Sequence, residues 1–463
     1  MAVILATAMA LSIAAVVLYW GLSSGGLPPA RNLRSNASAV DLAKRGTRPG
    51  QGIFAGRYGG NPFYARIEDR GLVIGPPRTG KTAFLFNQIL KASVNRVSFV
   101  AADMKPELAA ILGPSLEQGG YRVIVWNPVT GEGAAYNPLD DLIDAAEINE
   151  FVATLLPHEA RASTTAFRDA QRDFLRAALW HLHAQGWASL PGAYGLLARY
   201  ERLEDFLGAL EAGPSDLAAD IARRLKVGMG KDKLIENGFS SVRREIEYLN
   251  LPTVARSLGH SDFSLHQLGQ EAVPVALFLQ FEESRLGTMG ALLSAFYGHI
   301  FNVLIQNYRR RGPVALFYDE IGNLPLIEGF TAKLNTIASR NLPTWTYWQS
   351  TGQMSRYGAQ GEAVIFGSAD VQIFFRCNDV GTQETVSRSV GTTLDIRTTV
   401  THAAGRTGSS VSEQRVNVIE PHEVGELEIG EVVCLYRGGK AIGRATPYFV
   451  DYPAFLTTVA GDI

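Results

Sequence analysis

The chain has 463 residues, of which 46% are hydrophobic, and a formal net charge of −2 at pH 7. This length allows two soluble domains with packed cores. The balanced charge excludes steering of the whole molecule toward nucleic acid, so any such binding must come from a local patch. Two cysteines, Cys377 and Cys434, lack metal-ligand spacing and exclude a disulfide framework.

The N-terminal segment predicts a membrane anchor over residues 1–22. Residues 3–22 carry no charge, and twenty residues at helical rise span roughly the 30 Å of a hydrocarbon core. A cleaved signal peptide fits poorly because no basic region precedes the apolar run. Basic residues dominate the linker of residues 23–50, which places the bulk of the chain in the cytoplasm by the positive-inside rule. We therefore expect a single-pass protein of the inner membrane.

An apolar run that ends at Gly75 opens the pattern G-x-x-x-x-G-K-[ST], and a helix-like stretch follows it. Glycines let successive N–H groups turn toward one anion, and the helix adds the positive end of its dipole. Lys81 is expected to reach the β- and γ-phosphates of ATP, and the Thr82 hydroxyl to bind Mg²⁺. A chance match on a glycine turn is the alternative. The predicted nucleotide-binding residues are Gly75, Pro76, Pro77, Arg78, Thr79, Gly80, Lys81 and Thr82.

Apolar runs separated by helical patterns predict a parallel α/β sheet covered on both faces. The expected strands are residues 72–74, 97–103, 121–127, 273–281, 313–320, 344–349 and 371–377. Helical patterns alone fill residues 140–265, which we interpret as an all-α domain inserted into a nucleotide-binding domain of residues 51–139 and 266–463. Residues 392–416 are polar and predict a loop, whereas the tail from residue 431 predicts a hairpin that turns at Gly438 and Gly439.

Three later segments carry candidate catalytic residues. Asp319 and Glu320 end an apolar strand, where the first carboxylate could hold Mg²⁺ and the second could polarise a water. Gln349 ends another strand and could sense the γ-phosphate. Arg340 could neutralise phosphate charge on its own nucleotide or on that of a neighbouring subunit. The alternatives are two solvated acids, a capping amide and a surface arginine.

Two further segments have weaker signals. Asp103, Lys105 and Glu107 follow the second strand, where they could order the site or form a local ion pair. Residues 221–256 contain eight Arg and Lys against four Asp and Glu. Such a basic bias could follow a phosphate backbone, and a solvated helix face explains it equally well.

Taken together, the motifs resemble the type IV secretion coupling proteins, the TraG/TraD-like ATPases of conjugation. The resemblance rests on "GPPRTGKT", "ADMKPEL", "YNPLDDLI", "FYDEIGNL", "QSTGQMSRYG" and "CNDVGTQETVSRSVG" in this order. It implies a RecA/FtsK-like nucleotide domain with an inserted all-α domain. It also implies a homo-hexameric ring at a type IV secretion channel, which recruits single-stranded DNA with its relaxase, or effector proteins, and transfers them by ATP hydrolysis. On this basis Gln349 is a sensor and Arg340 a finger acting on the neighbouring subunit.

Two other functions are alternatives, and the nucleotide-binding residues agree with the first better than with the second. An FtsK-like DNA translocase outside any secretion system shares every nucleotide-binding residue. A non-hydrolysing membrane platform that gathers cargo has no need of intact Lys81, Asp319 and Glu320.

Overall fold

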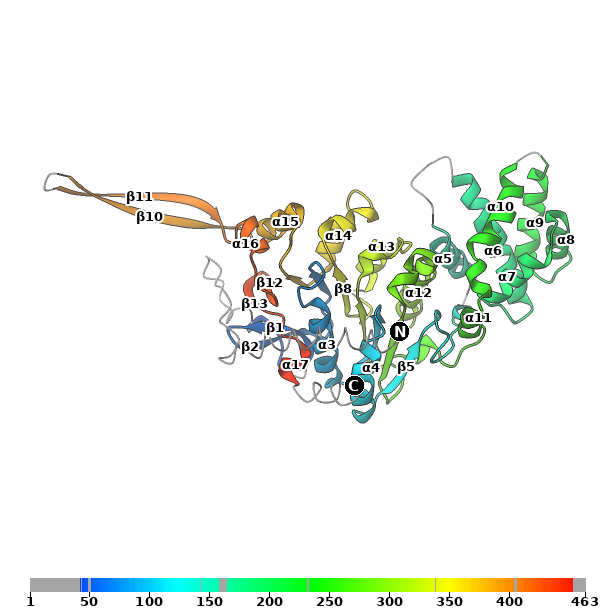
Figure 1. The fold of residues 1–463 in the computed structure, drawn as a ribbon, viewed down its shortest axis with the longest axis horizontal. Coiled ribbons are helices and arrows are strands. Elements are labelled where there is room, and N and C mark those ends of the chain that lie inside the picture. The colour runs from blue at the N-terminus through cyan, green and yellow to red at the C-terminus, as the bar shows by residue number, and fades with distance from the viewer. Residues whose placement is uncertain are drawn as a thin grey trace. The chain divides into compact units, whose positions relative to one another are not determined.

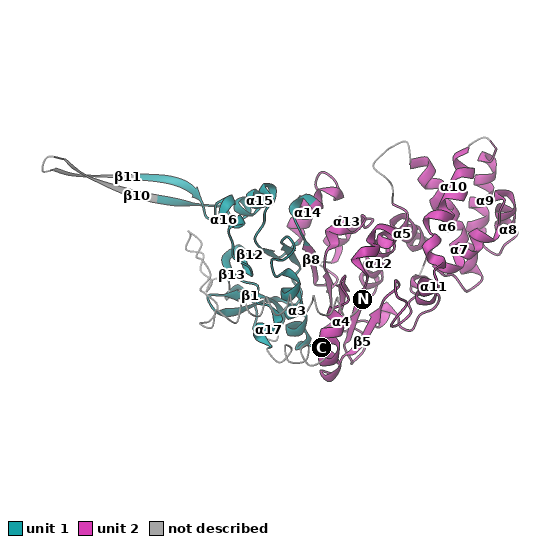
Figure 2. Ribbon diagram, in the orientation of Figure 1, with its two compact units in different colours: residues 1–95, 348–352, 369–463 teal, residues 96–347, 353–368 magenta. Residues whose placement is uncertain are grey.

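The computed structural model describes residues 42, 44–48, 51–142, 144–157, 165–230, 233–337, 339–403 and 406–452. The predicted anchor and most of the predicted linker lie outside these residues. The chain divides into two compact units (Figure 2). The first unit comprises residues 1–95, 348–352 and 369–463, and the second comprises residues 96–347 and 353–368.

The first unit contains the strand that leads into the phosphate loop. Its strands follow the order β2-β1-β13-β12-β9-β3, and only β3 and β9 are parallel. All four residues of β3 are buried, as its uninterrupted apolar sequence predicts. The elements are β1 (Gly52–Tyr58), β2 (Asn61–Arg66), β3 (Gly71–Ile74), α3 (Lys81–Ser93), β9 (Val371–Phe374), α15 (Val380–Val390), β10 (Thr392–Ala403), β11 (Arg406–Asn417), α16 (Pro421–Gly425), β12 (Glu431–Tyr436), β13 (Gly439–Arg444) and α17 (Tyr448–Asp451).

The prediction of a loop over residues 392–416 is wrong. β10 and β11 form a two-stranded antiparallel sheet in register from the Thr392–Asn417 pair to the Ala403–Arg406 pair, seen as an orange ribbon in Figure 1. Polarity misled the prediction, because the segment is rich in threonine and other β-branched residues that favour strands. The hairpin predicted for the C-terminal tail is confirmed as β12 and β13.

The second unit holds a fully parallel sheet in the order β8-β7-β4-β6-β5. Its strands coincide with the apolar runs of the sequence, and β4 and β7 are buried along their whole length. The strands and the helices between them are β4 (Ser98–Asp103), α4 (Leu108–Gln118), β5 (Arg122–Trp126), β6 (Val275–Gln280), α12 (Leu286–Gln306), β7 (Val314–Tyr318), α13 (Phe330–Ile337), β8 (Thr344–Trp348, whose last residue belongs to the first unit) and α14 (Gly361–Ser368).

Between β5 and β6, the described residues form helices and turns, as the sequence predicts. The rings of Phe174, Phe206 and Phe239 pack together in their core, with centroids 5.2 to 6.2 Å apart. Asp144, Ser189 and Ser215 cap three of the helices through their side-chain oxygens. The helices are α5 (Ala145–Leu155), α6 (Thr165–Ala184), α7 (Leu190–Arg199), α8 (Leu203–Glu211), α9 (Asp216–Gly228), α10 (Lys233–Glu245) and α11 (Pro252–Leu258).

One helical segment within the described residues, Glu283–Gln306, is long and apolar enough to cross a membrane. However, 78% of its apolar window is buried inside the protein, and the helix packs along α5. It is therefore the central core helix of the second unit.

Candidate nucleotide-binding site

The phosphate loop leaves β3 through a tightly enclosed glycine. The N–H of Gly75 donates to the carbonyl of Trp348 at 3.0 Å, and a Cβ at Gly75 would lie 2.7 Å from the Cβ of Phe375. Gly80 has φ 98° and Arg78 has φ 66°, so the loop turns through left-handed conformations on either side of Thr79. The Thr79 hydroxyl donates to the carbonyl of Pro76 at 2.8 Å, which closes the loop on itself.

Helix α3 begins at Lys81, and no side chain among the described residues caps its N-terminus. Gly80 occupies the N-cap position, and no acidic residue stands in the first turn of the helix. The first N–H groups of a helix lack intrahelical partners and favour an anion. Lys81 is 4% exposed, with Nζ 3.4 Å from the Trp348 carbonyl. Thr82 lies in the same helical turn, so the loop fits a polyphosphate with a bound cation.

The acidic pair lies in the second unit, directly after β7. Asp319 is 7% exposed, and its Oδ1 accepts the Glu320 N–H at 3.0 Å. Glu320 adopts φ 51°, an unfavourable angle for a residue with a side chain that is typical of functional sites. Its Oε2 accepts from Nδ2 of Asn323 at 3.1 Å. The acidic pair is therefore fixed by its turn and is not two loosely solvated acids.

Two residues that sequence reasoning missed support this turn. Oδ1 of Asn323 accepts from Nε2 of Gln353 at 3.0 Å, so an amide 30 positions further along the chain orients Asn323, the partner of Glu320. A Cβ at Gly322 would lie 2.1 Å from Oε1 of Gln353. Arg356 donates to the Gly322 carbonyl at 2.8 Å. The only signal in the sequence was that both segments belong to motifs of the coupling-protein resemblance.

Asp103 has a structural part at the start of α4. Its carboxylate accepts the N–H groups of Glu107, Leu108 and Ala109 at 2.9 to 3.2 Å, and the amide of Gln280 at 3.0 Å. Both oxygens are engaged, and the residue is 2% exposed. Burial raises the pKa of Glu107. This segment therefore joins β4, β6 and α4.

Arg340 lies at the opposite end of the strands from Asp319. Leu316 of β7 pairs with Thr344 of β8, so Arg340 precedes the amino end of β8 while Asp319 follows the carboxyl end of β7. Leu316 is the third residue of β7, so Asp319 lies three residues, or roughly 10 Å along the strand, beyond the amino end of β8. The Arg340 guanidinium stacks on Tyr308, 4.8 Å from the ring centroid. Gln349 directly follows Trp348 and belongs, with the phosphate loop, to the first unit.

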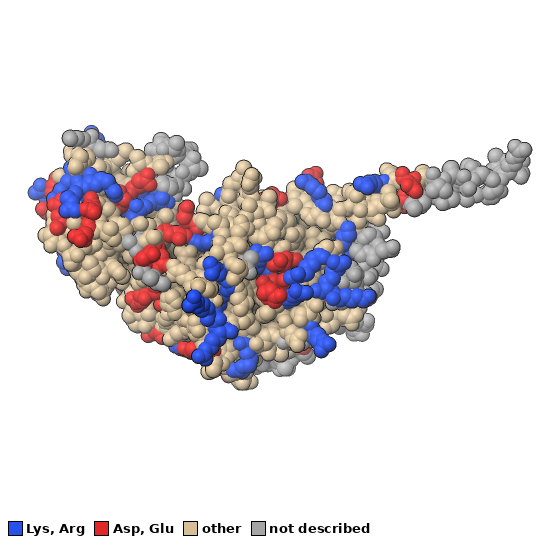
Figure 3. All heavy atoms as spheres, turned by 180° about the vertical axis from the view of Figure 1, so that it is seen from behind, with Lys and Arg blue, Asp and Glu red and all other residues tan. Residues whose placement is uncertain are grey.

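Three of the eight basic residues in residues 221–256 are paired with acids in the helical segment. Arg223 contacts Asp220, Arg224 contacts Asp173 at 2.8 Å, and Lys226 contacts Glu211. Figure 3 shows basic and acidic side chains lying next to one another on the helices at its upper left. This mixed surface favours the solvated-face interpretation over a continuous basic stripe.

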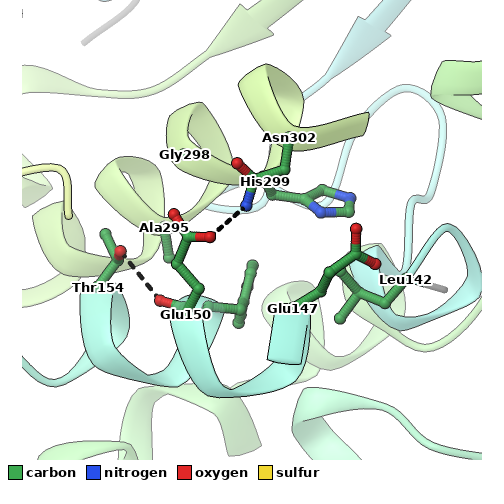
Figure 4. Close-up of a pocket in the computed structure, with 9 residues that line it drawn as sticks. Leu142, Glu147, Glu150, Thr154, Ala295, Gly298, His299 and Asn302 are labelled. Atoms are coloured by element: carbon green, nitrogen blue, oxygen red, sulfur yellow. Dashed lines mark hydrogen bonds between the residues drawn. The ribbon is translucent and has the colours of Figure 1, made fainter. Parts of the chain in front are cut away.

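A small cavity between α5 and α12 is a separate feature (Figure 4). Glu150 accepts from Asn302 at 3.0 Å and pairs with Lys333, and Glu147 accepts from Gln306. His299 lines it and contacts the Tyr136 hydroxyl at 2.7 Å, and burial lowers the His299 pKa to about 4. These polar groups join α5, α12 and the "YNPLDDLI" segment, and the described residues around the cavity offer no metal-binding cluster.

A phosphate loop between a buried strand and a helix, together with an acidic pair at the end of another buried strand, defines the class of P-loop proteins. The family model described as "Type IV secretory system Conjugative DNA transfer" matches residues 34–459, and the chain belongs to this family. The resemblance found in the sequence is thereby confirmed.

Individual relatives agree with the family. The conjugal transfer protein TraG of Escherichia coli is 24% identical over 465 residues, which cover 88% of this chain and 72% of TraG. The plasmid coupling protein TrwB in complex with ADP and Mg²⁺ has a TM-score of 0.69 and 17% identity, covering 91% of this chain and 96% of TrwB. TrwB bound to the ATP analogue ADPNP has the same TM-score and coverage with 19% identity. The predicted α/β fold with a helical domain is confirmed by this likeness.

Proposed function

We propose that this chain is a membrane-anchored P-loop ATPase, the coupling protein of a conjugative or related type IV secretion system. It recruits a DNA–relaxase complex or protein substrates and drives their transfer through a secretion channel as a homo-hexamer in the inner membrane. The proposal rests on the family match across residues 34–459, which includes the phosphate loop and the uncapped N-terminus of α3. The complexes of TrwB with ADP, Mg²⁺ and ADPNP support ATP and Mg²⁺ as the ligands.

The residues of the phosphate loop would bind the nucleotide through the backbone. The N–H groups of Arg78 to Thr82 would surround the phosphates, because Pro76 and Pro77 have no N–H and the Gly75 N–H donates to the Trp348 carbonyl. Lys81 would neutralise the β- and γ-phosphates. Thr82 and Asp319 are the proposed protein ligands of Mg²⁺. Bound ATP supplies the phosphoanhydride bond whose hydrolysis powers transfer.

The other candidate catalytic residues would take part in the hydrolysis of ATP. Glu320, oriented by Asn323, accepts a proton from the attacking water as general base. Gln349 senses the γ-phosphate from the segment that also supplies the Trp348 carbonyl to Lys81. The position of Arg340 at the amino end of β8 supports action on a neighbouring subunit, because its own acidic pair lies at the other end of β7.

The test uses cells that carry the chain's own transfer system. Deleting the chain should abolish transfer, and complementation with the wild type, but not with Lys81→Ala, should restore it. Normal transfer after deletion, with ATP turnover by the purified full-length chain, would indicate a translocase outside secretion. Restoration by Lys81→Ala would indicate a non-hydrolysing platform.

A further inference from the structure

The ring of Tyr308, just after α12, is in contact with two arginines, and its hydroxyl accepts from Nε of Arg309 at 3.2 Å. The guanidinium carbon of Arg340 is 4.8 Å from the ring centroid, and that of Arg309 is 5.5 Å from it. Tyr308 is 49% exposed, so this cluster is at the surface of the second unit. A guanidinium that stacks on an aromatic face is held by its charge and by its planar shape.

Another arginine, Arg310, holds the backbone of the loop that carries Arg340. Nη2 of Arg310 donates to the carbonyls of Arg340 and Asn341, the latter at 2.8 Å. Nη1 of Arg310 donates to the carbonyls of Leu304 and Asn307 at 2.7 and 3.0 Å. Arg310 is 6% exposed. It therefore ties the end of α12 to the backbone of the loop.

The side chain of Arg340 has a different support from its backbone. Its buried Nε has no hydrogen-bond partner among the described residues. The contact with Tyr308 is thus what directs the guanidinium, whereas Arg310 fixes only the main chain. A long arginine side chain loses considerable rotamer freedom when it acts, and a contact that orders it beforehand removes part of this cost.

We propose that Tyr308 is a positioning residue for Arg340, holding its guanidinium at the subunit surface for presentation to the nucleotide of the neighbouring subunit. This inference rests on the proposed role of Arg340 as a finger. It assigns two separate tasks, because Arg310 holds the loop and Tyr308 holds the charged group. Arg309 shares the ring and has no task at the nucleotide.

The first experiment measures ATP affinity and kcat for the full-length chain in detergent. Tyr308→Leu should bind ATP normally and lose about 2- to 5-fold in kcat, the range expected for loss of one exposed cation–π contact. Tyr308→Phe keeps the ring face and should retain most of the activity. Arg311→Ala is the matched control, because it removes an exposed arginine of the same segment and should leave kcat unchanged. Since Tyr308 is half-exposed, melting temperatures should agree, and Tyr308→Gln serves if the leucine variant is unstable.

The second experiment asks which subunit Tyr308 serves. In rings shown to exchange subunits, Tyr308→Leu subunits are mixed with Lys81→Ala subunits, which are inactive themselves but supply an intact Tyr308 and Arg340. Turnover per intact Lys81 should rise toward the wild-type value. An unchanged value would show that Tyr308 acts within its own subunit and would overturn the inference.

The outcomes also separate this inference from the proposed function. Normal turnover by Arg340→Ala would refute the finger itself, whatever Tyr308 does. Slow turnover by Arg340→Ala together with normal turnover by Tyr308→Leu would refute only the role of Tyr308.

Discussion

The phosphate loop and the acidic turn are built in opposite ways. The loop is one run of eight residues whose binding groups are mostly backbone N–H groups, arranged by Gly75, Gly80 and the start of α3. In the acidic turn the acting group is a side chain, and Glu320 depends on Asn323 and then on Gln353, which comes from a distant segment. A site built from backbone N–H groups is therefore determined by the local sequence, whereas the orientation of a catalytic side chain depends on tertiary contacts.

The largest expected effects separate binding from turnover. Lys81→Ala should abolish hydrolysis and weaken ATP binding, because it removes the positive charge that neutralises the phosphates. Glu320→Gln should bind ATP and lose about 10²- to 10⁴-fold in turnover, since a general base contributes that much. Titration with a fluorescent ATP analogue and a phosphate-release assay measure the two quantities. Equal loss of binding in both variants would show that the assigned roles are wrong.

The next effect concerns the side chains that orient Glu320. Asn323→Ala should lower kcat about 10-fold with ATP affinity retained, because a hydrogen bond to a charged group is worth about 1.5–3 kcal/mol. Gln353→Leu should lower kcat less, about 2- to 10-fold, because its bond to the neutral Asn323 amide is worth about 0.5–1.5 kcal/mol. The double variant should be little worse than Asn323→Ala, since the two residues act in series. Gln360→Leu, at an exposed position of the same unit, is the control. Strictly additive losses would mean that Gln353 acts elsewhere.

A smaller effect is expected from the glycine beneath Gln353. Gly322→Ala places a methyl group 2.1 Å from Oε1 of Gln353, so the amide must move away from Asn323. We expect kcat to fall several-fold with little change in melting temperature, because the displaced group is a side chain end. Gly287→Ala is the matched control, since a Cβ there meets nothing within 4 Å and the residue is helical. A large drop in melting temperature would show that Gly322 serves the fold more than the site.

The sequence predicted what depends on local pattern. The seven apolar runs became strands, and the phosphate loop and the acidic pair follow strands as expected. The β10–β11 hairpin was missed because its polar composition hid a high strand propensity. The β1–β2 hairpin was missed because it precedes the α/β rhythm. The capping task of Asp103 and the stacking of Arg340 on Tyr308 depend on contacts that no single-segment pattern contains.

The smallest effect tests whether the helical segment contributes to binding nucleic acid. Single-stranded DNA binding should weaken with salt, with a slope of about 0.7 for each phosphate contact. Replacing Arg223, Arg224 and Lys226 with glutamine should flatten this slope if they contact phosphates. The measurement is a fluorescence-anisotropy titration of an oligonucleotide at several salt concentrations. An unchanged slope would show that the three residues belong to a solvated helix face and do not contact DNA.

The ion pairs of these three basic residues allow a second experiment, in which their acidic partners are replaced. Asp220, Asp173 and Glu211 hold the three basic groups in the free protein, so DNA must compete with them. Exposed pairs are worth only about 0–1 kcal/mol each, which phosphates can replace. Asp220→Asn, Asp173→Asn and Glu211→Gln should then tighten DNA binding at low salt and steepen the slope, the reverse of the basic substitutions. If the acidic substitutions change nothing while the basic ones weaken binding, the loss comes from damage to the helices. Opposite shifts of the slope would show that phosphates contact these three side chains.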